Sequence, residues 1–203
     1  MIARVDIRLA RLSGPSAADL RLLSAGERER VRSFTSDRDR DGWVGARALL
    51  RRTLARWVGA DPADLVFAYG ATGKPSLPGG PFFSLAHSAG WAIVAISGEA
   101  PVGADIELVR PQIARPPSAD VFFGDRERAE LEALAEPQRT RRFFQLWTLK
   151  EAYRKATGEG VGRGSLGELP PAGWAGWRPN PPAGYEAAVV VLAEAAEFRR
   201  SPP

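Results

Sequence analysis

The stretch Val102-Gly103-Ala104-Asp105-Ile106-Glu107-Leu108 decides both the expected fold and the expected chemistry. As a β-strand it would place its apolar side chains on one face, with Asp105 and Glu107 together on the other. Two neighbouring carboxylates repel each other unless a cation joins them. Oxygen ligands of this kind suit Mg²⁺, which takes one or two carboxylates together with phosphate oxygens and water. The alternative is the solvated face of an edge strand.

A second motif lies in Trp147-Thr148-Leu149-Lys150-Glu151-Ala152-Tyr153-Arg154-Lys155. A helix over this segment places Glu151 and Lys155 on one side, one turn beyond Trp147. An isolated pair at this spacing is usually a surface ion pair that contributes only about 0.3 to 0.5 kcal/mol.

The chain has one histidine, His87, at the point where a predicted strand runs into a turn. A lone histidine near apolar residues is more often a packed, hydrogen-bonded side chain than a catalyst. Upstream, Lys74 stands between Gly73 and Pro75, where it could present a fixed ammonium to a phosphate or simply be solvated.

Hydrophobic periodicity and turn residues predict the surrounding elements. The order of strand, helices and strands occurs about twice, before and after Pro101, which hints at a duplicated fold divided into residues 1–100 and 101–203. The expected strands are 2–9, 82–86, 91–96, 102–108 and 185–193, and the expected helices are 16–32, 42–58 (capped by Asp41), 122–134 and 140–157, with 158–184 mostly looped.

Composition narrows the class of protein. The 203 residues are 44% hydrophobic and 26% charged, values typical of a folded globular protein. The absence of cysteine excludes disulfides, a thiolate nucleophile and cysteine-ligated metal sites. Residues 1–12 alternate apolar and charged side chains, so neither a signal peptide nor a membrane span is expected, and a cytoplasmic location follows by default.

The formal net charge is +4, and the basic residues cluster in Arg28–Arg32, Arg38–Arg56 and Arg139–Arg142. Such clusters could attract nucleic acid, a phosphorylated cofactor or an acidic protein. A nucleic-acid-binding module is therefore one hypothesis, although it leaves Asp105, Glu107 and Glu151 unexplained.

Four segments, taken in order, resemble the phosphopantetheinyl transferases of the surfactin-synthetase-associated type. That family carries a Gly-Lys-Pro turn, a Ser-His-Ser-like strand end, a Val-Gly-Ile-Asp-Ile-Glu strand and a Trp-x-x-Lys-Glu-(Ala/Ser)-x-x-Lys helix. The matching segments here are Gly73–Pro75, Ala86–Ser88, Val102–Glu107 and Trp147–Lys155. The resemblance covers about residues 28–160, with a weaker echo at 184–185, and it implies an α+β fold of two similar lobes. Each lobe would be a small antiparallel sheet packed with helices, with the ligand in the cleft between them.

The resemblance also implies an activity: Mg²⁺-dependent transfer of the phosphopantetheine of coenzyme A to a serine of an acyl or peptidyl carrier protein, with release of 3',5'-ADP. The implied metal ligands are Asp105, Glu107 and Glu151, and the implied coenzyme A contacts are Arg40, Arg47, Lys74, Pro75, His87, Ser88 and Lys155. Lys155 and His87 would neutralise phosphate oxygens during catalysis. Glu151, a metal-bound water or Glu127 would deprotonate the serine, and Glu127 would also lie near the docked carrier.

The implied partner is an acidic carrier protein that binds transiently, with neither nucleic acid nor membrane as a partner and a monomer as the expected state. The pathway, whether fatty-acid, polyketide or nonribosomal peptide synthesis, is left open. The chain departs from the family at Ala86, where many relatives carry serine. A lost hydroxyl contact to phosphate would weaken coenzyme A binding, so a coenzyme A binder without transferase activity is a further hypothesis.

Overall fold

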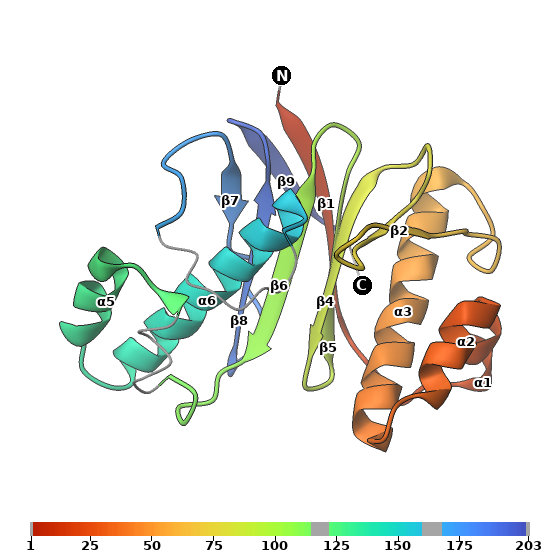
Figure 1. Cartoon of the computed structure of the whole chain (residues 1–203), viewed down its shortest axis with the longest axis horizontal. Helices are drawn as coiled ribbons and strands as arrows, with labels where there is room; N and C mark the ends of the chain where they lie inside the picture. The colour runs from red at the N-terminus through yellow and green to blue at the C-terminus, as the bar shows by residue number, and fades with distance from the viewer. Residues whose placement is uncertain (1, 115–121, 160–167, 202–203) are drawn as a thin grey trace.

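The computed structural model describes residues 2–114, 122–159 and 168–201. Two sheets lie side by side in the centre of the molecule, with helix α3 on one flank and helix α6 on the other (Figure 1). The helices are α1 (Ala17–Leu22), α2 (Ala25–Arg32), α3 (Asp37–Val58), α5 (Asp125–Glu132) and α6 (Gln138–Thr157). The strands are β1 (Ala3–Arg11), β2 (Ala68–Tyr69), β3 (Pro75–Ser76), β4 (Phe82–Ser88), β5 (Trp91–Ser97), β6 (Val102–Leu108), β7 (Ala175–Trp177), β8 (Tyr185–Val191) and β9 (Ala196–Arg200).

The first sheet has the strand order β4-β5-β1-β9. The predicted hairpin of β4 and β5 is confirmed, and its register pairs Phe82 with Ser97 and Ser88 with Trp91. Strand β9 was not predicted, and it runs parallel to β1, with Val5 opposite Phe198. The first sheet is therefore mixed, and the expectation of purely antiparallel sheets is wrong for it.

The second sheet has the order β6-β8-β7 and is antiparallel throughout. It confirms the predicted strand 102–108, which pairs with β8 from Val102↔Val191 to Leu108↔Tyr185. The apolar face of β6 joins a core shared with β1, because Ala104 and Ile106 pack in the same cluster as Val5. The proposed division at residue 100 stays a prediction.

Helix α6 covers the other face of β6, and Gly103 makes this close packing possible. A Cβ built on Gly103 would lie 1.8 Å from the Ala152 carbonyl oxygen and 2.5 Å from the Ala156 nitrogen. Only a residue without a side chain lets these two backbones approach so closely. The face that carries Asp105 is therefore buried under a helix, and its interpretation as a solvated edge is wrong.

Two predicted helix boundaries are also wrong. The helix expected over 16–32 is two helices, because Leu23 is extended and Ser24 starts α2 with a capping box closed by Glu27. Helix α3 starts at Asp37 under a Ser36 cap, before the expected start after Asp41. The first turns of α2 and α3 are polar, so they show none of the apolar periodicity from which the helix boundaries were predicted.

Within the described residues, no helix is both long and apolar enough to cross a lipid bilayer.

Candidate functional site

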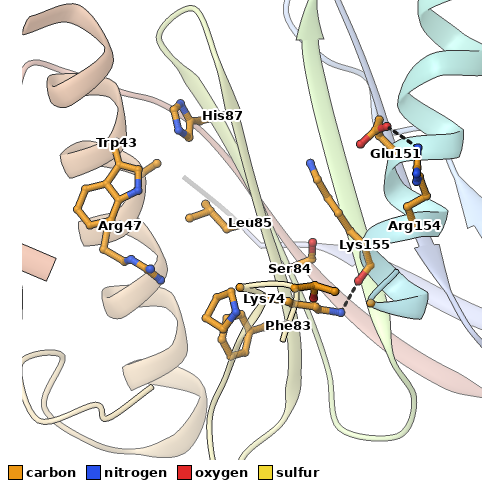
Figure 2. A pocket seen from close by; sticks show the side chains of 15 residues that line it. Trp43, Arg47, Lys74, Phe83, Ser84, Leu85, His87, Glu151, Arg154 and Lys155 are labelled. Atoms are coloured by element: carbon orange, nitrogen blue, oxygen red, sulfur yellow. Dashed lines mark hydrogen bonds and ion pairs between the residues drawn. The ribbon is translucent and has the colours of Figure 1, made fainter. Parts of the chain in front are cut away.

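A cavity of about 320 Å³ lies between α3, the turn before β3, strand β4 and the last turns of α6 (Figure 2). Its lining is rich in cationic groups and contains one carboxylate. The lining residues are Trp43, Ala46, Arg47, Thr72, Gly73, Lys74, Pro75, Phe83, Ser84, Leu85, His87, Glu151, Arg154, Lys155 and Gly158. The structure thus brings six of the predicted site residues to one place: Arg47, Lys74, Pro75, His87, Glu151 and Lys155.

Arg47 reaches the cavity from the buried face of α3. Its Nε lies 3.1 Å from a carboxylate oxygen of the buried Glu27, and its Nη2 donates a hydrogen bond of 3.0 Å to the Tyr69 hydroxyl. The guanidinium also lies over the ring of Trp43, at 5.3 Å from the ring centre. The cation is therefore fixed before any ligand enters.

Lys74 connects the β2–β3 turn to the other side of the cavity. Its Nζ donates to the carbonyl oxygen of Lys155, in the last turn of α6, and lies 3.5 Å from the carbonyl oxygen of Val102. The final carbonyls of a helix lack partners within the helix and favour a cation. Burial lowers the pKa of Lys74 below 10.5. Gly73, at φ +76°, adopts the left-handed backbone that this turn requires.

His87 lines the cavity from the same face of β4 as Leu85. Burial lowers the pKa of the imidazole below 6.5, and the positive charge of Lys155 lowers it further against an opposing contribution from Asp39. His87 is therefore a neutral group at neutral pH that faces a cationic wall.

Ser84 and Ser88, on β4, join the two sheets. The Ser84 Oγ accepts a hydrogen bond of 3.0 Å from the Ala104 backbone N–H. The Ser88 Oγ accepts one of 3.3 Å from the Leu108 N–H and donates one of 2.8 Å to Glu107. Ser88 was predicted to contact coenzyme A, but the structure places it against Glu107 and not in the cavity lining.

Ala86 occupies the position of β4 at which the resemblance led us to expect a serine. It lies in the apolar core with Ile93 and Val102. A hydroxyl there would face the core, because residues 85 and 87 point to the cavity and residue 86 points away from it. In this fold a serine at position 86 would not reach the cavity. The alanine therefore removes no contact to a phosphate there.

Asp105 is the most buried of the predicted metal ligands. Its Oδ1 lies 2.6 Å from the Nζ of Lys155, while its Oδ2 is buried with no hydrogen-bond partner. Lys155 therefore pairs with Asp105 across the contact between α6 and β6, and not with Glu151 on its own helix. The interpretation of Glu151 and Lys155 as a simple surface pair is wrong.

Glu107 and Glu151 flank Asp105. Burial raises the pKa of both side chains, and the charge of Asp105 raises each further. The three carboxylates are thus electrostatically coupled, and an unpaired Asp105 oxygen is a donor suited to a hard cation. In the described parts of the chain, however, no three acidic or histidine side chains are placed to hold one ion together.

Arg40 and Glu127 lie outside the cavity lining. Arg40 is half exposed and pairs with Asp37 at 2.7 Å and with Asp41 at 3.1 Å. Glu127 accepts a hydrogen bond of 3.0 Å from the Gly124 N–H at the start of α5, and pairs with Lys150 at 2.6 Å. Both side chains already have partners, and their roles toward a ligand or a carrier remain predictions.

Sequence reasoning missed several lining residues, above all Trp43 and Arg154. Trp43 had a signal, because it lies one helical turn before Arg47 on the same face of α3. Arg154 stands inside the quoted helix motif, but only the packing of α6 shows that it reaches the cavity.

A cavity with a mainly cationic lining, beside electrostatically coupled carboxylates, has the chemistry to hold a small polyanionic ligand. Residues 101–181 match the 4'-phosphopantetheinyl transferase superfamily.

Three relatives illustrate the likeness. A putative 4'-phosphopantetheinyl transferase of Synechocystis sp. is 37% identical over 147 residues, which cover 70% of this chain and 60% of the relative. The 4'-phosphopantetheinyl transferase HetI of Nostoc sp. is 35% identical, covering 70% of this chain and 62% of HetI. The 4'-phosphopantetheinyl transferase Sfp of Bacillus subtilis is 31% identical, covering 68% of this chain and 62% of Sfp.

The chain spans about three fifths of the length of the curated relatives it matches. Together these likenesses relate the chain to proteins that are named 4'-phosphopantetheinyl transferases. They do not single out the surfactin-synthetase-associated type.

Proposed function

We propose that this protein transfers the phosphopantetheine group of coenzyme A to a serine of an acyl or peptidyl carrier protein, in the manner of the surfactin-synthetase-associated type. The observation that carries the proposal is the convergence of Arg47, Lys74, Arg154 and Lys155 on one cavity, with Glu151 in its wall. Such a cavity suits the several phosphate charges of coenzyme A. The family of its relatives supports the phosphopantetheine group as the part transferred.

The cationic groups of the cavity would divide the phosphates of the ligand between them. Arg47, from α3, and Lys74, from the turn between β2 and β3, would hold the 3'-phosphate end of the adenosine, with Pro75 forming the wall beside them. Lys155, which pairs with Asp105 on β6, and His87, whose imidazole lies against Gly42 of α3, would contact the pyrophosphate. Holding the ligand at both ends fixes its reacting phosphorus relative to the carrier serine.

The reaction needs little covalent work from the enzyme. The Oγ of the carrier serine forms a bond to the phosphorus on the pantetheine side, the bond from that phosphorus to the bridging oxygen breaks, and 3',5'-ADP leaves. The serine proton passes to a base, for which Glu151 is favoured because it lines the cavity.

A magnesium ion would be held by Asp105, Glu107 and Glu151. The donor chemistry supports Asp105 in this role, because one of its buried oxygens has no partner and its charge is coupled to those of Glu107 and Glu151. The three side chains would have to move to meet at one ion, because in the described residues they do not converge on a common point. When bound, the ion supplies positive charge to the phosphate oxygens. Lys155, which neutralises Asp105 in the free protein, would support the same phosphate oxygens.

An acidic carrier protein remains the proposed partner. Much of the basic character of the sequence is neutralised locally, because Arg52, Arg139, Arg141 and Arg142 all pair with nearby carboxylates. The formal net charge of +4 still favours encounter with an acidic partner. The proposal of a nucleic-acid-binding module has less support. The cationic groups Arg47, Lys74, Arg154 and Lys155 line a cavity, whereas binding to nucleic acid would use an exposed basic stripe.

The decisive experiment incubates the protein with coenzyme A, Mg²⁺ and an apo carrier protein, followed by mass spectrometry of the carrier. The expected result is a mass increase of one phosphopantetheine group that is lost when Mg²⁺ is removed with a chelator. Several fatty-acid, polyketide and peptidyl carriers should be tried in parallel. A carrier of unchanged mass in every case would defeat the proposal.

A further inference from the structure

Two side chains from different elements hold Arg47. Glu27, on α2, lies 3.1 Å from the Nε on one side. Tyr69, on β2, accepts a hydrogen bond of 3.0 Å from Nη2 on the other side. Figure 2 shows the Arg47 side chain leaving α3 and turning its guanidinium toward the β4 side of the cavity.

Glu27 is shared between two arginines. Arg51 lies 2.7 Å from the same carboxylate and uses its other donors on the carbonyl oxygens of Pro62, at 2.8 Å, and Leu65, at 3.0 Å. Arg51 therefore uses its hydrogen bonds to stabilise the fold. One carboxylate between two guanidinium groups leaves a net positive charge, and Arg47 is the member of the group that lines the cavity.

Arg47 has two buried nitrogens without a hydrogen-bond acceptor among the described residues, Nε and Nη1. The Nε is at least in ion-pair contact with Glu27, whereas Nη1 has no such contact. A buried donor without an acceptor is costly, and such groups in a native fold usually have a role beyond stability. An anion that enters the cavity would supply the missing acceptor.

Tyr69 is placed to orient Arg47 and not to stabilise the core. Its side chain is 53% exposed, its ring centre lies 6.0 Å from the guanidinium carbon, and its strand pairs with β3 so that Tyr69 is opposite Pro75. The β2–β3 pair therefore carries both Lys74 and the residue that orients Arg47. A rigid phenol near the protein surface can fix a guanidinium at little cost in side-chain entropy.

We propose that Tyr69 is a positioning residue for Arg47, and that the chain of contacts from Glu27 through Arg47 to Tyr69 sets the preference of the cavity for a ligand that carries a 3'-phosphate. This inference rests on the proposed function, because it takes coenzyme A as the ligand. Tyr69 acts through Arg47: its hydroxyl fixes Nη2, which leaves Nη1 for the phosphate oxygen.

The test measures KM and kcat of carrier modification with coenzyme A and with 3'-dephospho-coenzyme A for the Tyr69→Phe protein. The change removes one hydroxyl from an exposed residue, so the fold is expected to stay intact. We expect KM for coenzyme A to rise about fivefold, as for loss of one hydrogen bond, with kcat nearly unchanged. With the dephospho ligand, Tyr69→Phe and wild type should have the same KM.

Two controls isolate the route of the effect. Tyr153→Phe is the matched substitution on α6, where the ring packs against Trp174 outside the cavity lining, and it should leave KM unchanged. In an Arg47→Ala background, in which Glu27 keeps Arg51 as a partner, Tyr69→Phe should have no additional effect on KM.

Three results would overturn the role of Tyr69 while leaving the proposed function intact: an unchanged KM for coenzyme A, an equal rise for both ligands, or additive effects of the Tyr69 and Arg47 substitutions. A wild-type protein that modifies no carrier would instead overturn the proposed function on which the inference rests.

Discussion

The Nζ of Lys155, on α6, lies 2.6 Å from the Oδ1 of Asp105, on β6. This pair joins two motifs that are 50 residues apart in the sequence. It lies where Gly103 lets the helix reach the strand, so a backbone feature and an ion pair act on the same contact. The pair occupies one oxygen of Asp105 and leaves the other buried and unpartnered.

Replacing Asp105 by alanine should reduce transfer by more than about a hundredfold, since it removes a metal ligand and the partner of Lys155. Mass spectrometry of the carrier measures the rate, and circular dichroism checks that the variant is folded. Asp64→Ala, in an exposed turn, is the control and should behave as wild type. A folded Asp105→Ala protein with wild-type rates would remove the metal assignment.

Replacing Gly103 by alanine should lower the free energy of unfolding by at least about 3 kcal/mol, because the new methyl group would collide with the backbone of α6. Denaturant unfolding measures the change. Gly14→Ala is the matched control, since a Cβ at Gly14 meets nothing within 4 Å, and it should shift the free energy by less than about 0.5 kcal/mol. Equal stability of the two variants would contradict the backbone contact.

The pKa of His87 should be below 6.5 in the folded protein, since burial and the charge of Lys155 both disfavour the imidazolium. Because His87 is the only histidine, its single imidazole signal in an NMR titration reports this pKa directly. Between 6.5 and the lower folded pKa, the unfolded chain binds more protons than the native one. The free energy of unfolding therefore falls as the pH drops through this window.

Stability measurements offer a second check on His87. From about pH 7 to about pH 5, wild type should lose more stability than a His87→Asn variant. Bound coenzyme A should raise the pKa of His87 if the imidazole contacts phosphate oxygens. A folded-state pKa at or above that of the denatured chain would contradict the desolvation of the imidazole by its neighbours.

Replacing Ala86 by serine should leave KM for coenzyme A within about twofold of wild type, because position 86 faces the apolar core. The same change should lower the free energy of unfolding by about 1 to 2 kcal/mol, as a hydroxyl enters an apolar cluster. Steady-state kinetics and denaturant unfolding measure the two effects, with Ala63→Ser in an exposed turn as control. A clear fall in KM would mean that residue 86 does reach the ligand.

Much of the local structure could be predicted because it depends on short patterns of apolar, polar and turn-forming residues. The alternation in 102–108 predicted β6, and the turn at 88–90 predicted the β4–β5 hairpin. Strand β9 could not be predicted in this way, because it is short, half exposed and rich in charge, and only its pairing with β1 makes it a strand. Helix starts failed where capping side chains outweighed apolar periodicity, as at Ser36.

The candidate site likewise has a part that the sequence predicts and a part that it does not. The sequence by itself determined which candidate groups the site can use, because Asp105, Glu107, Glu151, Lys155 and His87 stand in motifs whose residue types suit a bound phosphate and a cation. Only the tertiary structure decided which of these groups meet. It pairs Lys155 with Asp105, turns Ser88 toward Glu107 and Ala86 into the core, and keeps Arg40 and Glu127 out of the cavity lining. The physical reason is that spacing along one strand or helix sets which side chains share a face, whereas contacts between α3, β4, β6 and α6 depend on packing between elements far apart in the chain.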